Sequence, residues 1–296
     1  MFFLLGHALL TLGSTWGLPA AAPLEMQAGY PVLAGVWVNG AGPYRMLLDT
    51  GAESTSLRPS LAVKSSLAPQ FAVTLESAAG VAVTPVAIAR RMEAGGVSLA
   101  DVEVLLAEPP QFPAGKPVDG VLGQSFLRRT SYWIHYTKGF IAFDVSGRLD
   151  NCLQGRALPL SLVKGRPAIP VRMGAAGERR LVLDSGASHV ILTGPFAAQG
   201  RVREASFRTA TASRAGKMLT LPLMEAGNRL WQNVLAGWLD EAAPEPGGLF
   251  PAHLLRSFYV SSQRQSVLVE PGVAEPCASG PAEPPDRKDG ATETGW

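Results

Sequence analysis

One short segment occurs twice in this chain. Residues 47–52 read Leu-Leu-Asp-Thr-Gly-Ala and residues 182–187 read Val-Leu-Asp-Ser-Gly-Ala, so Asp49 and Asp184 are 135 positions apart. In both copies an apolar run ends at the aspartate, and a glycine follows two residues later. This pattern is typical of a strand that passes into a turn. We expect a duplicated fold that brings the two carboxyl groups together across a pseudo-twofold axis.

The repeated pattern resembles the pepsin/retropepsin superfamily of aspartic peptidases, whose motif is Asp-Thr/Ser-Gly after apolar residues. The resemblance covers roughly residues 30–270. Pepsin-like chains carry one motif in each lobe, whereas retropepsins carry one in each subunit of a homodimer. This chain holds both copies, so the resemblance implies that dimerisation is not required. The short lobes, and flap candidates without tyrosine, are more similar to the retropepsin-like proteins of bacteria.

The resemblance implies a mostly β fold with two homologous β-barrel-like lobes. We expect an N-terminal lobe over residues 28–150, a linker over 151–157 and a C-terminal lobe over 158–270. Residues 271–296 are rich in proline, glycine and charge, which predicts a disordered tail. Long amphipathic helices are hard to find, and short helices are expected at 58–66, 124–129 and 251–257.

Later segments of the two halves also correspond. Residues 119–127 contain an apolar pair followed by Gly123, and residues 247–255 contain an apolar pair followed by Pro251. Glycine accepts close backbone approach, whereas proline fixes φ and removes a donor. The substitution predicts an irregular second lobe at this point. The strands that follow, around Trp133 and Tyr259, match as well and are expected to pack in the core.

The resemblance assigns roles to six residues of the repeat. Asp49 and Asp184 would form the catalytic dyad. The hydroxyl groups of Thr50 and Ser185 would hydrogen-bond across the lobe interface. The remaining two residues, which would give backbone N–H groups room to reach the carboxylates, are Gly51 and Gly186.

Two adjacent carboxyl groups cannot both ionise easily, so they share one proton and titrate as a pair; pepsin-type enzymes are the standard illustration. The ionised member would take a proton from a water between them, while the protonated member donates to the scissile carbonyl. The water attacks, and the resulting gem-diol expels the amine. The resemblance implies no cofactor and no metal, and a peptide or protein as the substrate.

In this superfamily a β-hairpin flap closes over an extended peptide. The first-lobe candidate spans residues 74–83, with Ala79 and Gly80 as substrate-binding positions. The second-lobe candidate spans residues 209–218, with Ala215 and Gly216 in the same role. Ordinary surface hairpins remain the alternative for both.

The N-terminal residues 1–22 are a candidate signal peptide. An apolar stretch of h-region length is followed by small residues, although a positively charged start is missing. An apolar N-terminal strand is the alternative. With a signal peptide, the protein is exported to the periplasm or secreted, or is held at a membrane if the segment is not cleaved.

Composition and the remaining motifs exclude several functions. The net charge is +2, only 17% of residues are charged and no basic run marks a nucleic-acid footprint. No Cys/His spacing is typical of a metal site, and no glycine-rich phosphate loop is present. The two cysteines, Cys152 and Cys277, could pair in an exported protein or stay free.

Three functional hypotheses follow. The first is an exported aspartic endopeptidase that uses Asp49 and Asp184. The second is a non-catalytic protein that binds peptides or a partner with the same fold, a reading that Pro251 favours and the intact motifs oppose. The third is a β-rich structural module whose turns only resemble a catalytic site.

Overall fold

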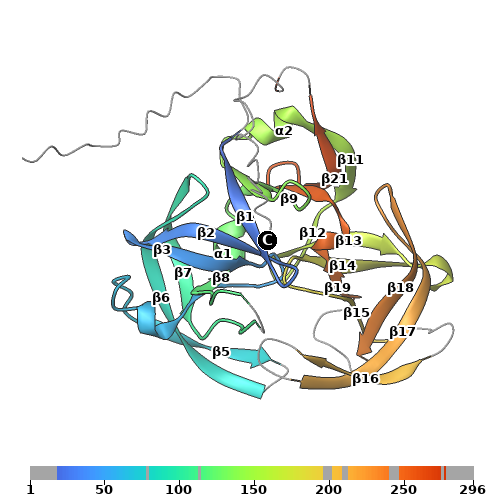
Figure 1. The fold of residues 1–296 in the computed structure, drawn as a ribbon, viewed down its shortest axis with the longest axis horizontal. Helices are drawn as coiled ribbons and strands as arrows, with labels where there is room; N and C mark the ends of the chain where they lie inside the picture. Colours follow the sequence, from blue (N-terminus) through green and yellow to red (C-terminus); the bar gives the residue numbers. More distant parts are fainter. Residues whose placement is uncertain are drawn as a thin grey trace, which may run out of the picture.

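The computed structural model describes most of the chain as two β-rich lobes on either side of a shared sheet (Figure 1). The described residues are 19–77, 80–112, 115–195, 202–208, 213–239, 247–274 and 277. The predicted residues 1–18 of the signal segment and 278–296 of the tail lie outside them. The expected fold class, mostly β with two barrel-like lobes, is confirmed.

The first lobe is built from antiparallel hairpins and two parallel pairings, β3 with β8 and β4 with β7. Its strands are β2 (Tyr30–Val38), β3 (Ala41–Leu48), β4 (Thr55–Leu57), β5 (Phe71–Ser77), β6 (Gly80–Ala94), β7 (Val97–Leu106) and β8 (Gly120–Leu122). An Asn-Gly turn joins β2 to β3, and both turn residues have positive φ (51° at Asn39, 82° at Gly40), as a tight hairpin requires. Strand β3 then runs parallel to β8, which is antiparallel to β4.

The second lobe repeats this arrangement. Its strands are β12 (Ser161–Val163), β13 (Arg166–Arg172), β14 (Glu178–Asp184), β15 (Val190–Thr193), β16 (Arg203–Arg208), β17 (Ser213–Ala226), β18 (Arg229–Leu239) and β19 (Gly247–Pro251). Strand β14 runs parallel to β19, and β19 is antiparallel to β15. The duplication expected from the sequence is therefore also a duplication of topology.

Strands from both halves join in a shared antiparallel sheet, ordered β11-β21-β20-β9-β10-β1. Its members are β1 (Ala21–Gln27), β9 (Ser131–His135), β10 (Phe140–Asp144), β11 (Leu153–Pro159), β20 (Ser257–Ser261) and β21 (Ser266–Val273). The halves meet where β9 pairs with β20, and there Trp133 lies opposite Tyr259. Residues that match in the repeat thus face each other, as a pseudo-twofold axis between β9 and β20 requires. Both are buried, as expected.

Helices are short, and three of the five that the structure describes lie within the predicted ranges. The described ones are η1 (Pro59–Leu61), α1 (Gln124–Leu127), α2 (Arg148–Cys152), η2 (Gly174–Ala176) and η3 (Ala252–Leu254). Strand β1 begins at residue 21, inside the segment 1–22 expected as a signal peptide, and Ala21 pairs with Ala142 of β10. In the described ranges, no helix has the length and apolar character needed to cross a membrane.

The connection between the lobes differs from the expected linker. Residues 151–157 form the end of α2 and most of β11, which pairs along β21. Residues 271–273, expected as the start of a disordered tail, instead form the end of β21, which pairs with β11. Cys152 of α2 forms a disulfide with Cys277, another residue of the expected tail. The pairing left open by the sequence is therefore present.

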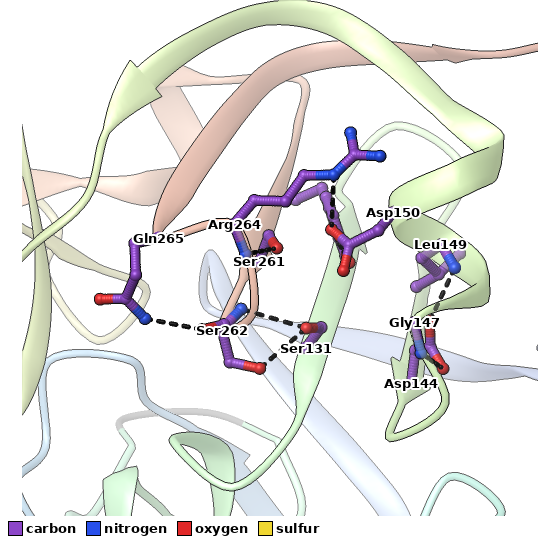
Figure 2. A network of polar contacts seen from close by, with 10 residues as sticks. Ser131, Asp144, Gly147, Leu149, Asp150, Ser261, Ser262, Arg264 and Gln265 are labelled. Atoms are coloured by element: carbon purple, nitrogen blue, oxygen red, sulfur yellow. Dashed lines mark hydrogen bonds and ion pairs between the residues drawn. The ribbon is translucent and has the colours of Figure 1, made fainter.

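Polar contacts add to this junction (Figure 2). Asp150 of α2 accepts a hydrogen bond from the Tyr259 hydroxyl at 2.9 Å, and its carboxylate lies 3.7 Å from Arg264 Nε. Ser131 and Ser262 hydroxyls meet at 3.0 Å across the two halves. The link between the lobes is therefore part of the shared sheet's packing and positions one lobe against the other.

Candidate active site

The two motif aspartates lie at corresponding points of the two lobes. Asp49 directly follows β3, and its backbone N–H donates to the Leu122 carbonyl of β8 at 3.1 Å. Asp184 is the last residue of β14 and lies opposite Pro251 of β19. Each aspartate therefore stands where a buried strand ends beside a parallel neighbour, and the lobe interface brings the two loops together.

Four hydrogen bonds join the loops through Thr50 and Ser185, both buried. The Thr50 hydroxyl donates to the Leu183 carbonyl at 2.6 Å and accepts from the Ser185 N–H at 2.9 Å. In return, the Ser185 hydroxyl donates to the Leu48 carbonyl at 2.7 Å and accepts from the Thr50 N–H at 2.9 Å. Each hydroxyl thus uses its donor and an acceptor on the other lobe, so the loops are held in a reciprocal, fully satisfied contact.

The motif glycines leave room for the opposite carboxyl group. Each donates its N–H to the aspartate of its own loop, at 2.9 Å for Gly51 to Asp49 and 2.7 Å for Gly186 to Asp184. A Cβ atom on Gly51 would lie 2.3 Å from Cγ of Asp184, and one on Gly186 would lie 2.6 Å from Oδ2 of Asp49. Because such distances are shorter than any non-bonded contact, both positions require glycine.

The two carboxyl groups approach each other across the lobe interface, each beside the motif glycine of the other loop, and each affects the pKa of the other. Burial raises the pKa of Asp184 well above its usual range, and the charge of Asp49 raises it further. Burial also raises the pKa of Asp49, while its hydrogen bonds with Asp184 and with the Gly51 and Ala52 N–H groups act in the opposite direction. Burial thus raises the pKa of both carboxyl groups above the usual value for aspartate.

Three further polar side chains surround the dyad, and sequence reasoning missed their place in it. Gln124 Nε2 donates to the Thr50 carbonyl at 2.8 Å. Arg166 of β13 donates from Nη1 to the Gly51 carbonyl at 3.4 Å. Burial lowers the pKa of Arg166, and the negative charges of both aspartates act in the opposite direction. Tyr136, which follows β9, also faces both aspartates, and burial raises its pKa well above the usual value. The sequence offers one signal for Arg166: it is a charged residue at the start of the otherwise mostly apolar strand 166–172.

The second lobe departs from the first beside its aspartate. In the first lobe the Gly123 N–H donates to the Thr55 hydroxyl at 3.1 Å. The corresponding residues are Pro251, which has no N–H, and Val190, which has no hydroxyl. The N–H donor and the hydroxyl that accepts from it are thus replaced together. The expected irregularity at Pro251 is local, since β19 still pairs with β14.

Both flap candidates belong to hairpins on the side of the molecule away from the shared sheet (Figure 1). In the first lobe β5 and β6 pair up to Ser77 and Gly80; Ala79 lies outside the described residues. In the second lobe β16 and β17 pair up to Arg208 and Ser213; residues 209–212 also lie outside the described residues. Ala215 and Gly216 lie in β17, opposite Ser206 and Ala205 of β16, and not at the turn.

In the part of the chain that the structure describes, no group of three or more His, Cys, Asp or Glu side chains is placed to hold a metal ion.

Comparisons with known proteins agree with this geometry. A family model described as aspartyl protease matches residues 34–126, which include the first motif and the segment ending at α1. No curated protein was found to match the chain in sequence.

Solved structures show a similar fold. The aspartic proteinase from Irpex lacteus superposes with a TM-score of 0.53 at 12% identity, covering 88% of this chain and 98% of its own. A retropepsin-like aspartic protease from Rickettsia conorii, at 15% identity, covers 42% of this chain and 89% of its own with a TM-score of 0.31, too low to indicate a shared fold. Residues 34–126 thus match the aspartyl protease family model, and the chain as a whole shares the fold of a solved aspartic proteinase.

Proposed function

We propose that the protein is an aspartic endopeptidase that hydrolyses peptide bonds with Asp49 and Asp184. The observation that carries the proposal is the position of the two carboxyl groups, each held by the N–H of its own motif glycine and each beside the motif glycine of the other loop. A family match and a shared fold support a peptidase-type function, and the dyad adds the chemistry. Neither aspartate forms a covalent bond to the substrate in this mechanism.

The hydrolytic step needs one ionised and one protonated carboxyl group. The ionised member accepts a proton from a bound water as the water oxygen attacks the scissile carbonyl carbon. The protonated member donates to the carbonyl oxygen, which gives a neutral gem-diol. Proton return to the nitrogen then breaks the C–N bond and releases amine and carboxylic acid products. Reciprocal Thr50–Ser185 hydrogen bonds fix the separation of the two carboxyl groups throughout.

We further propose that an extended peptide lies between the dyad and the two hairpins, with Gly80, Ala79, Ala215 and Gly216 as candidate contacts. Export is proposed as well, since the Cys152–Cys277 disulfide suits an oxidising compartment. Both halves of the dyad are in one chain, so the activity does not need a second copy. No metal or nucleic acid has a role in this mechanism.

Digestion of an unfolded protein by wild type, Asp49→Asn and Asp184→Asn tests the proposal. Each asparagine keeps the size of the side chain but cannot share or accept the proton, so each variant should lose a factor on the order of 10³ or more in kcat/KM. Asp101→Asn, a change at an exposed aspartate of β7, is the matched control and should cleave as wild type does. Unchanged cleavage by either dyad variant would reject the shared site.

A non-catalytic peptide-binding protein is the second candidate function, favoured by Pro251 in the second lobe. In that case wild type would bind extended peptides without cleaving them. The donor and acceptor pair lost at Pro251 and Val190 leaves the dyad's own contacts intact, which is why we place the peptidase first.

A further inference from the structure

We propose that Arg166 is a positioning residue of the dyad, which holds the first-lobe catalytic loop and stabilises the single negative charge on the two aspartates. This inference rests on the proposed peptidase function. It adds a residue that neither motif contains. Arg166 is the first residue of β13 in the second lobe, and its guanidinium crosses the lobe interface to the Gly51 carbonyl.

The guanidinium is buried and oriented. Only 9% of Arg166 is exposed, and its Nε donates to the Val163 carbonyl at 3.2 Å across the β12–β13 hairpin. The hydrogen bond from Nε orients the planar guanidinium group, and Nη1 donates to the Gly51 carbonyl at 3.4 Å. An arginine that loses most of its hydration in this way must gain from nearby negative charge, and Glu53 and both dyad aspartates supply it.

The charge is present on one side of the pseudo-twofold axis only. Hairpins β1–β2 and β12–β13 are equivalent: Gln27 pairs with Tyr30 in the first, and Val163 with Arg166 in the second. Tyr30 therefore takes the place of Arg166 in the first lobe, and its ring packs on Phe112 with centroids 5.3 Å apart. Two carboxyl groups that must share one charge need one such cation, and the duplicated fold supplies one.

Other titratable groups near the dyad do not duplicate this effect. Tyr136 faces both aspartates from the end of β9, and its raised pKa keeps it neutral in acidic and neutral solution. Glu53 faces Arg166 and partly offsets its charge at the dyad. His253 contacts Ala187 of the second loop, with His189 beside it, and neither is among the groups that shift the dyad pKa values.

Arg166→Met tests the role, with Arg166→Lys as the charge-conserving variant. Loss of the cation should raise both apparent pKa values of the dyad, so the pH–activity profile moves to higher pH by about one unit. Lysine should keep the wild-type pH midpoints but lose kcat/KM, because an ammonium cannot reproduce the fork at Gly51. Arg91→Met removes an equal charge from an exposed pair with Glu93 and should leave the profile in place.

Titration of the carboxyl ¹³C signals in Asp-labelled protein gives the same pKa values without any turnover. Displaced pKa values for Asp49 and Asp184 in Arg166→Met, but not in Arg91→Met, would support the role even if wild type cleaved nothing, in which case only the proposed function fails. Unmoved pKa values, with loss of thermal stability alone, would overturn it and leave Arg166 as a structural contact between lobes.

Discussion

At the scale of single residues, the site depends on four positions that most other residue types cannot fill without losing hydrogen bonds or colliding with a carboxyl group. Thr50 and Ser185 are buried and exchange four hydrogen bonds, so each hydroxyl satisfies backbone groups that water cannot reach. Glycine is required at positions 51 and 186 because a Cβ atom would collide with the opposite carboxyl group, and not because the backbone angles are unusual. The residues of the Asp-Thr/Ser-Gly motif therefore depend on one another, and the same contacts occur on both sides of the pseudo-twofold axis.

Thr50→Val should separate the hydroxyl from the shape of the side chain. Valine fills the same space but leaves the Ser185 N–H and the Leu183 carbonyl without partners, which costs about 2–4 kcal/mol in the free energy of unfolding. Urea denaturation measures the change, and kcat/KM should fall with it because the loops lose their register. Thr50→Ser keeps the hydroxyl and should stay close to wild type. Equal stability of the valine and serine variants would contradict this account.

At the scale of elements, the two lobes share a topology but differ beside their aspartates. Strand β19 ends in Pro251, with φ of −63° and ψ of 114°, and still pairs with β14. The first lobe uses a Gly123–Thr55 hydrogen bond at this point, and the second uses Pro251 and Val190 with neither donor nor acceptor. The substitution is thus a matched replacement of a polar contact by an apolar one.

Pro251→Gly should therefore leave kcat/KM close to the wild-type value. It should lower the free energy of unfolding by about 1 kcal/mol, because glycine gives the unfolded chain more conformational freedom than proline. Thermal denaturation and peptide hydrolysis on the same preparation measure both quantities. A large gain in activity would show instead that the proline impairs the second lobe.

The repeat at constant spacing predicted a duplicated fold, and the resemblance predicted two β-rich lobes, because neither needs knowledge of packing; α2 and η2 were not predicted. The repeat missed Arg166 because a β-bulge between Leu33 and Val36 shifts the register of β2. Constant spacing aligns Arg166 with Pro31, whereas the hairpins pair it with Tyr30.

A different physical cause explains the second hairpin. Gly216 suggested a turn, but its missing side chain serves packing: a Cβ there would lie 2.9 Å from Cε2 of Phe207. A single sequence does not distinguish a glycine that allows a turn from one that accommodates an aromatic ring. The expected linker failed for a related reason, since residues 151–157 become a strand only by pairing with β21, a tertiary contact.

At the scale of the whole molecule, the shared sheet determines how the two loops meet. Its central pairing of β9 with β20 lies on the pseudo-twofold axis, and Asp150, Tyr259 and Arg264 connect α2 to the second half beside it (Figure 2). The Cys152–Cys277 disulfide closes the same region. A fixed relation between lobes is what allows two carboxyl groups from distant parts of the chain to share one proton.

The central claim is that one proton is shared by two buried carboxyl groups, and the pH dependence of kcat/KM for wild type measures it most directly. Burial and the mutual charge raise the pKa of Asp184, so the second ionisation, which abolishes activity, should occur well above the usual aspartate range. The first ionisation, which creates the active form, should occur at lower pH than the second but still above the usual aspartate value, because burial also raises the pKa of Asp49. We predict a bell-shaped profile that falls on both sides. Activity that stays level into alkaline solution, or that lacks the acidic limb, would contradict the account.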